Sequence, residues 1–508
     1  MPRLPRCLFR RIRVAACGLV GLVWLHSLGS ARAGEEAAAA MEDVRRAVDL
    51  FVNARTAGST DAFVVAVAKV KEMADAGQTF FRFLLAVYAA QEPLCGLSEE
   101  QRTRYLDEGR PLMRTHAREG NALAQYLTGL DCDFNLNKPG EARDWYARAA
   151  AQGQSLAQNA LGLKYFRGEG VPQDDDKAGE LFRQAALQGD RNGEYNLAAL
   201  YAQGRGVPKD AGMAFVLYTR AAEKGHSSAM NNLGWLCQEG RGTEKDLKTA
   251  AAWYRRSAEC GNADGQFNYG FVCARGRGVP RDPREAGLWF WRAAEQGHAE
   301  AQVNIGLLYR EGDGIKQDDR KALTWFAKAA EQRHAMAQFF IGQMYEEGRG
   351  VPQDSERAFN WYTKAADQDN PRAVNALGTF HYRGIVVPKD YAQAERHYRR
   401  AAEAGSAAAQ NNLGMLYLRG EGVPQDHARA AEWFARAARQ GAAEAAYNLA
   451  ALYEYGRGVE LSHVRAVELF KQAALQGHVA AAEWLFKNGY TAWVERIRAE
   501  RGERASVQ

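Results

Sequence analysis

Six asparagines stand at one recurring position of this 508-residue chain, separated from one another by 36 residues or by a multiple of 36. They are Asn196, Asn232, Asn268, Asn304, Asn412 and Asn448. Each side-chain amide offers two donor hydrogens and an acceptor oxygen, and it does not act as an acid, a base or a nucleophile. The chemistry that this spacing indicates is therefore hydrogen bonding at regular intervals.

The motifs that carry catalysis are missing from the sequence. The chain contains no P-loop, H-E-x-x-H, C-x-x-C, G-x-S-x-G or EF-hand pattern, and no serine is followed three residues later by lysine. Its recurring glycine-rich stretches follow predicted helices, whereas a phosphate-binding loop follows a strand. We predict a protein with no catalytic residues, no metal site and no cofactor.

Several histidines also recur with the period of 36. The residues at the first position of a repeated unit are His226, His298, His334 and His478. Neighbouring units are offset by roughly 8–10 Å, too far apart to share one zinc ion, so we predict turn residues. His381 and His397 replace the Tyr and Trp of other units, which indicates substituted buried aromatics. The same unit has Val386 where a loop glycine is expected.

The period belongs to a repeat that divides Gln154 to Gly477 into nine consecutive units of 36 residues. The unit from Ser406 to Gly441 reads SAAAQNNLGMLYLRGEGVPQDHARAAEWFARAARQG. Small and apolar residues at helical spacing predict a first helix, which a glycine such as Gly420 ends. An aspartate such as Asp426 then caps a second helix that carries an aromatic pair and ends in Ala-Ala. We predict two helices in every unit.

This pattern resembles the Sel1-like repeat, a relative of the tetratricopeptide repeat. The resemblance implies an all-α, right-handed α-solenoid of helix–turn–helix repeats. Degenerate repeats occupy 78–153, the nine regular repeats 154–477, and a half repeat with a capping helix 478–508. Residues 34–77 are predicted to form a helical cap at the N-terminal end, because the terminal units of a solenoid expose a face that a neighbour would cover.

Residues 1–33 have the pattern of a signal peptide. Five arginines precede the apolar stretch from Val14 to Leu28, and Ala31-Arg32-Ala33 suits cleavage. Removing this segment changes the net charge from +5 to −1, since 60 basic and 61 acidic residues remain. We therefore predict a periplasmic or secreted protein, with tethering by an uncleaved signal as the alternative. The charge gives no argument for binding nucleic acid, and no stable membrane insertion is expected after cleavage.

Five cysteines follow the signal peptide, and an odd number leaves at least one unpaired within the chain. Cys132, Cys237 and Cys273 occupy a position that is usually Tyr, which favours simple burial. Cys95 and Cys132 are expected at the same edge of the solenoid, so they are a candidate disulfide.

By the resemblance to tetratricopeptide proteins, the six asparagines would face a concave groove and bond the backbone of a bound peptide. The alternative is that each bonds the adjacent repeat and stabilises stacking. The function predicted is an extracytoplasmic scaffold or regulator that binds a partner protein or peptide. Two alternatives remain: a β-lactam- or peptidoglycan-interacting hydrolase, as in the cysteine-rich branch of the family, and a carbohydrate-binding module. The paired cysteines of that branch, about eight residues apart, are not found here.

Overall fold

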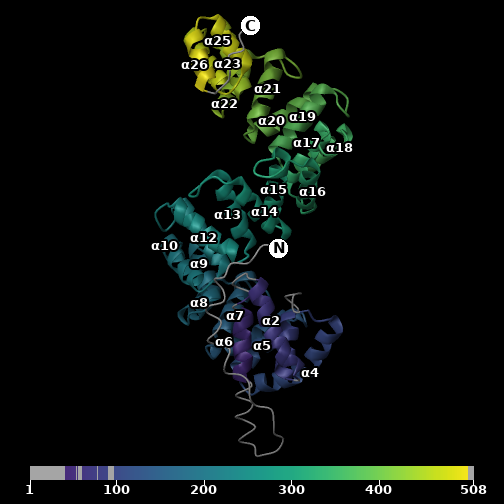
Figure 1. Ribbon diagram of the computed structural model, residues 1–508, viewed down its shortest axis with the longest axis vertical. Coiled ribbons are helices and arrows are strands. Elements are labelled where there is room, and N and C mark those ends of the chain that lie inside the picture. Colours follow the sequence, from purple (N-terminus) through teal and green to yellow (C-terminus); the bar gives the residue numbers. More distant parts are fainter. Residues whose placement is uncertain (1–40, 53, 55–59, 77, 90–95, 501–508) are drawn as a thin grey trace, which may run out of the picture. The chain divides into compact units, whose positions relative to one another are not determined.

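The computed structural model of the chain describes residues 41–52, 54, 60–76, 78–89 and 96–500. Throughout this part of the chain the regular secondary structure is helical, and no strand occurs (Figure 1). The predicted signal peptide, 1–33, lies outside the described residues. No helix within the described ranges is both long and apolar enough to cross a membrane.

The chain forms two compact units, which meet in sequence between Lys224 and Gly225. In the first unit, residues 41–52 form a helix and α2 spans Thr60–Asp75. The helices that follow pair in order along the chain: α3 (Thr79–Ala89) with α4 (Glu99–Arg118), α5 (Ala122–Phe134) with α6 (Pro139–Ala151), α7 (Ser155–Arg167) with α8 (Asp175–Leu187), and α9 (Arg191–Gln203) with α10 (Ala211–Glu223).

The second unit continues the same series of pairs. They are α11 (Ser227–Glu239) and α12 (Leu247–Glu259), α13 (Ala263–Arg275) and α14 (Pro283–Glu295), α15 (Ala299–Glu311) and α16 (Asp319–Glu331), α17 (Ala335–Glu347) and α18 (Ser355–Ala366), α19 (Pro371–Arg383) and α20 (Tyr391–Glu403), α21 (Ala407–Arg419) and α22 (His427–Arg439), α23 (Ala443–Tyr455) and α24 (His463–Leu475). Two shorter helices, α25 (Val479–Lys487) and α26 (Thr491–Glu500), close the series.

From α7 to α23, each first helix begins 36 residues after the previous one. The predicted fold class, an all-α solenoid of helix–turn–helix repeats of 36 residues, is confirmed. The predicted helix ends are confirmed as well. Gly420, for example, adopts the left-handed conformation with φ +69° and donates its N–H to Leu416, and the Asp426 carboxylate accepts from the amide of Arg429.

Small residues let the two helices of a repeat pack closely. A Cβ added to Gly414 of α21 would lie 2.7 Å from Cε1 of Phe434 on α22. The Phe434 side chain is fully buried there, as is Ala437 one turn further along the same helix. Glycine at this position therefore sets the distance between first and second helices, and the aromatic ring fills the space that glycine leaves.

The helix formed by residues 41–52 packs against later helices of the first unit. Phe51 stacks on Tyr88 of α3 with ring centroids 4.7 Å apart. Val48 and Val52 line a cavity of about 290 Å³ together with Leu123 of α5 and Arg191 of α9. Arg191 Nη2 also donates to the backbone oxygen of Val52 at 3.2 Å. This helix therefore covers the ends of successive first helices in its own unit.

Candidate functional site

A groove of about 670 Å³ lies in the second unit on the side formed by first helices. Its walls come from three successive repeats: Phe339 and Gln343 on α17, Asn375 and Thr379 on α19, and the turn into α21 at Ser406. We call this the first-helix groove. The 36-residue period places it here because equivalent positions of consecutive first helices point to the same side.

The first-helix groove is lined by the hydroxyl groups of Tyr362 and Thr379, by the carboxylate of Glu346 and by the guanidinium of Arg372. Tyr362 donates its hydroxyl hydrogen to Glu346, and Thr379 Oγ1 lies 3.1 Å from the Tyr398 hydroxyl oxygen. Burial raises the pKa of both tyrosines further above the ordinary value near 10, at which a tyrosine is already protonated at neutral pH. The groove thus presents amides and hydroxyls beside one carboxylate and one guanidinium, and the neutral groups suit the N–H and C=O groups of a peptide.

The six predicted asparagines form a row of equivalent positions on first helices; all six side chains are half-buried, and none of them lines the first-helix groove. Four of them donate Nδ2 to an asparagine Oδ1 on the preceding first helix, 37 residues earlier. These pairs are Asn196–Asn159 at 2.7 Å, Asn268–Asn231 at 2.8 Å, Asn412–Asn375 at 2.9 Å and Asn448–Asn411 at 3.0 Å. The row therefore ties adjacent repeats together, as one of the two interpretations requires.

Asn304 shows why the pairing depends on the residue 37 positions earlier. That residue is Phe267, which has no amide, and Asn304 instead donates to the backbone oxygen of Glu300 at 2.7 Å. The sixth member, Asn232, is half-buried on α11.

Stacking does not use up the hydrogen-bonding capacity of a pair. In the Asn412–Asn375 bond, one Nδ2 hydrogen of Asn412 and one lone pair of Asn375 are engaged. The second hydrogen of Asn412, its oxygen and the amide nitrogen of Asn375 remain. Because both side chains are half-buried and Asn375 lines the first-helix groove, the same pair can stabilise stacking and bond a ligand.

A row of buried glutamines also links the repeats, and the sequence analysis missed it. Gln410 is 5% exposed, donates to the backbone oxygen of Ala402, and accepts from Gln440 Nε2 at 2.9 Å. Gln158 and Gln188 form the same contact at 2.7 Å. The sequence signal was present, because these glutamines are separated by 36 residues or by a multiple of 36.

The histidines at the start of the repeats are N-caps, which refines their interpretation as turn residues. The Nδ1 atoms of His226, His298, His334 and His478 accept from the backbone amide three residues later, at 3.1–3.4 Å. Within the described residues, no group of three or more His, Cys, Asp or Glu side chains could hold a metal ion. His381 and His397 stack on each other with centroids 5.3 Å apart.

The four cysteines of the described residues form no disulfide with one another and are buried or half-buried. Burial raises the pKa of Cys132 and brings that of Cys273 to about 11, so neither is a ready thiolate nucleophile. Cys95, the predicted partner of Cys132, lies outside the described residues. The disulfide between them stays a prediction.

A tryptophan on a first helix is open to solvent. Trp235 of α11 occupies the repeat position of Gln343 and Thr379, is 40% exposed, and carries Arg241 over its ring at 4.7 Å.

The fold and the groove define an α-solenoid repeat protein. Comparison with families gives ten matches to the Sel1 repeat, at residues 121–154, 155–190, 192–226, 227–262, 263–298, 299–334, 335–370, 371–406, 407–441 and 443–478. The chain belongs to the Sel1 repeat family. The resemblance inferred from the sequence is thereby confirmed.

A solved structure agrees with this assignment. The chain is similar to c5321, a protective antigen present in uropathogenic Escherichia coli strains, with 30% identity, a TM-score of 0.63, and coverage of 87% of this chain and 98% of that one. It also resembles a Sel1 repeat protein from Oxalobacter formigenes, with 35% identity, a TM-score of 0.47, and coverage of 61% and 89%. No curated protein matches the chain.

Proposed function

We propose that this protein is a scaffold that binds a segment of a partner protein in the first-helix groove. The observation that carries the proposal is Asn375, which lines this groove and begins a run of paired amides that continues beyond the lining on α21 and α23: Asn375 with Asn412, and Asn411 with Asn448. These amides keep donors and acceptors that a peptide backbone can use, at intervals fixed by the repeat. A Sel1 repeat solenoid fits protein–protein interaction as a coarse function.

The second part of the proposal is the compartment. The arginine-rich start, the apolar stretch to Leu28 and the Ala31-Arg32-Ala33 site support export and cleavage after Ala33. Cell fractionation followed by N-terminal sequencing of the purified protein tests this directly. A mature chain beginning at Gly34 is expected; an intact N-terminus in the cytoplasmic fraction would remove the extracytoplasmic location.

The binding proposal is tested by crosslinking in cells and mass spectrometry. The native chain is compared with one in which Asn375, Asn411, Asn412 and Asn448 are changed to alanine. We expect one dominant partner, lost in a variant whose helix content by circular dichroism is unchanged. Undiminished recovery of that partner by the folded variant would show that these amides do not bind it.

A second candidate function, carbohydrate binding, is favoured by the exposed ring of Trp235. A sugar stacked on this ring would change the tryptophan fluorescence, and Trp235→Ala would abolish that change. Titration with peptidoglycan fragments is the measurement, and an unchanged signal would dismiss this candidate.

A further inference from the structure

Tryptophan occupies one position of the second helix in most repeats of the second unit. A cation lies over each ring: Trp253 with Arg256 at 4.4 Å, Trp289 with Arg292 at 4.5 Å, Trp325 with Lys328 at 4.0 Å, Trp361 with Lys364 at 4.2 Å, and Trp433 with Arg436 at 4.5 Å. Trp289 and Trp325 are 6% and 8% exposed, and Trp253, Trp361 and Trp433 are half-buried. The repeat is therefore built to enclose an indole ring beside a positive charge.

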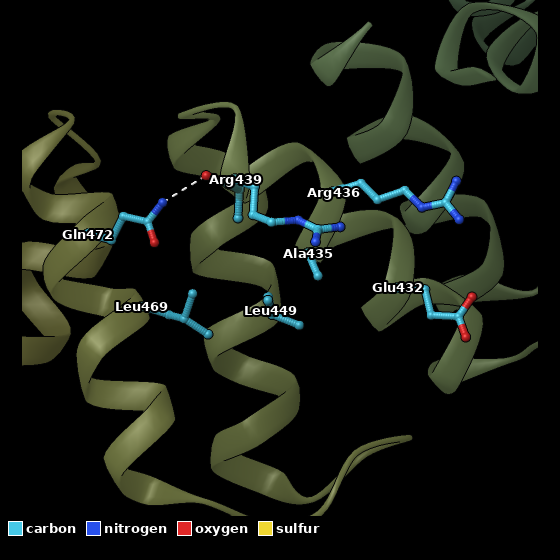
Figure 2. Close-up of a pocket in the computed structure, with 8 residues that line it drawn as sticks. Glu432, Ala435, Arg436, Arg439, Leu449, Leu469 and Gln472 are labelled. Atoms are coloured by element: carbon cyan, nitrogen blue, oxygen red, sulfur yellow. Dashed lines mark hydrogen bonds between the residues drawn. The ribbon is translucent and has the colours of Figure 1, made fainter. Parts of the chain in front are cut away.

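Two repeats of the second unit break this rule: α20 carries His397 at the tryptophan position, and the last full repeat carries no aromatic ring there. On α24 the tryptophan position is taken by Leu469, and the cation position by Gln472. A groove of about 590 Å³ lies there, lined by Ala435, Ala438 and Arg439 of α22 and by Leu449 of α23 (Figure 2). Leu449 stands at the same repeat position as Tyr269, against which the Trp289 ring packs edge-on at 5.6 Å. The groove therefore occupies the place that an indole fills elsewhere.

The floor and rim of this groove differ in character. Figure 2 shows Leu449 and Leu469 next to one another below Arg439 and Gln472, and Gln472 Nε2 donates to the backbone oxygen of Ala438 at 2.8 Å. At the rim, Arg436 and Arg439 are exposed, and within the described chain no carboxylate forms an ion pair with either. Glu432 is the acidic residue of the lining. The net charge at the rim is positive, which favours an anionic group on the occupant.

We propose that this groove, on the second-helix side, binds an aromatic side chain of a partner protein. The same partner would carry a carboxylate group next to the aromatic ring. The ring would take the place of the tryptophan that Leu469 replaces, and the carboxylate would lie at Arg439. This site is separate from the first-helix groove, so it is a second contact surface and does not depend on the asparagine row.

The test uses the full chain and three small probes, followed by saturation-transfer NMR. N-acetyl-tryptophan presents an indole ring and a carboxylate. N-acetyl-tryptophan amide has the ring without the negative charge, and N-acetyl-leucine has the carboxylate without the ring. We expect saturable binding of N-acetyl-tryptophan to the native chain. The affinity should be about threefold lower for N-acetyl-tryptophan amide, and about threefold lower for N-acetyl-tryptophan on the Arg439→Gln variant, because a partly exposed ion pair contributes about that factor. Leu469→Trp should fill the groove and weaken binding by about tenfold or more.

Leu475→Trp is the matched control, because Leu475 lies on the same helix, is 51% exposed and is absent from the lining. It should bind N-acetyl-tryptophan as the native chain does. Leu469→Trp should also raise the melting temperature above that of Leu475→Trp, since its ring would be buried. No saturable binding, equal binding of N-acetyl-leucine, or undiminished binding by Leu469→Trp would each overturn the proposal.

Discussion

The side-chain amide of Asn412 on α21 donates to Oδ1 of Asn375 on α19 at 2.9 Å, across the boundary between two repeats. The two residues are 37 apart, one more than the repeat period. The bond therefore joins two neighbouring positions of the first helix and not two equivalent ones. Within the described residues, every asparagine of the predicted row that has another asparagine 37 residues earlier forms this bond.

Asn375→Ala and Asn412→Ala, made singly and together, measure the energy of this bond. Each single change should lower the free energy of unfolding by about 0.5–1 kcal/mol, and the double change should cost less than the sum. Chemical denaturation of the full chain is the measurement. Asn304→Ala is the control, because Asn304 bonds its own helix and should show no coupling with Asn375→Ala. Strictly additive effects of Asn375 and Asn412 would refute the inter-repeat role.

An ion pair replaces the glutamine pair at one repeat boundary. Glu194, with a side chain 3% exposed, lies 2.7 Å from Lys224 Nζ, and Lys224 also donates to the backbone oxygen of Gly189 at 2.9 Å. Lys224→Met should lower the free energy of unfolding by roughly 2–3 kcal/mol, because it leaves the buried Glu194 carboxylate without its partner. The loss is at the low end for a buried ion pair because Lys224 itself is partly exposed. The double change Glu194→Gln and Lys224→Gln should restore most of the lost stability, because it recreates the Gln–Gln contact of the other repeats. Thermal unfolding compares the variants, and a double variant as unstable as Lys224→Met would contradict the interpretation.

Val386 is held in a conformation that suits glycine. Its φ is +66°, and the same loop position is a left-handed glycine in neighbouring repeats, as at Gly350 and Gly422. A β-branched residue is strained there. Val386→Gly should therefore stabilise the chain by about 1 kcal/mol. Val386→Ala keeps a Cβ and should gain much less. A Val386→Gly variant that melts below the native protein would show that the Val386 side chain makes a compensating contact.

His334 should make stability fall in mild acid. Its Nδ1 caps α17 by accepting from Ala337, and burial lowers the His334 pKa below 6.5, although Glu300 at 4.0 Å opposes this shift and His298 adds to it. The folded state therefore binds this proton less readily than the unfolded state. The contribution to stability is fully present above pH 6.5 and is lost as the pH falls through the lowered folded pKa.

His334→Asn keeps a capping acceptor and does not titrate, so it should flatten the dependence of melting temperature on pH. Asn262 and Asn370 cap α13 and α19 in this manner. His334→Ala should lose about 1 kcal/mol already at neutral pH. Parallel pH profiles for the native chain and His334→Asn would show that this imidazole is not responsible.

The parts of the fold that depend on local chemistry could be predicted from the sequence. Gly420 ends its helix and Asp426 starts the next because the conformation and capping group are properties of those residues and their neighbours. The contact of Asn412 with Asn375 depends on how successive repeats are offset, and the period of 36 does not reveal an offset of 37. The groove at Leu469 arises from one missing ring, which matters only once the helices that surround it are in place.

The most direct test of the central claim is site-specific photocrosslinking in cells. A photoreactive phenylalanine analogue at Thr379 lies in the first-helix groove, and the same analogue at Arg396, an exposed residue of α20, serves as the control. The proposed function predicts that one partner protein crosslinks from Thr379 and not from Arg396. A partner that crosslinks equally from both positions, or only from Arg396, would contradict the assignment of the groove as the binding surface.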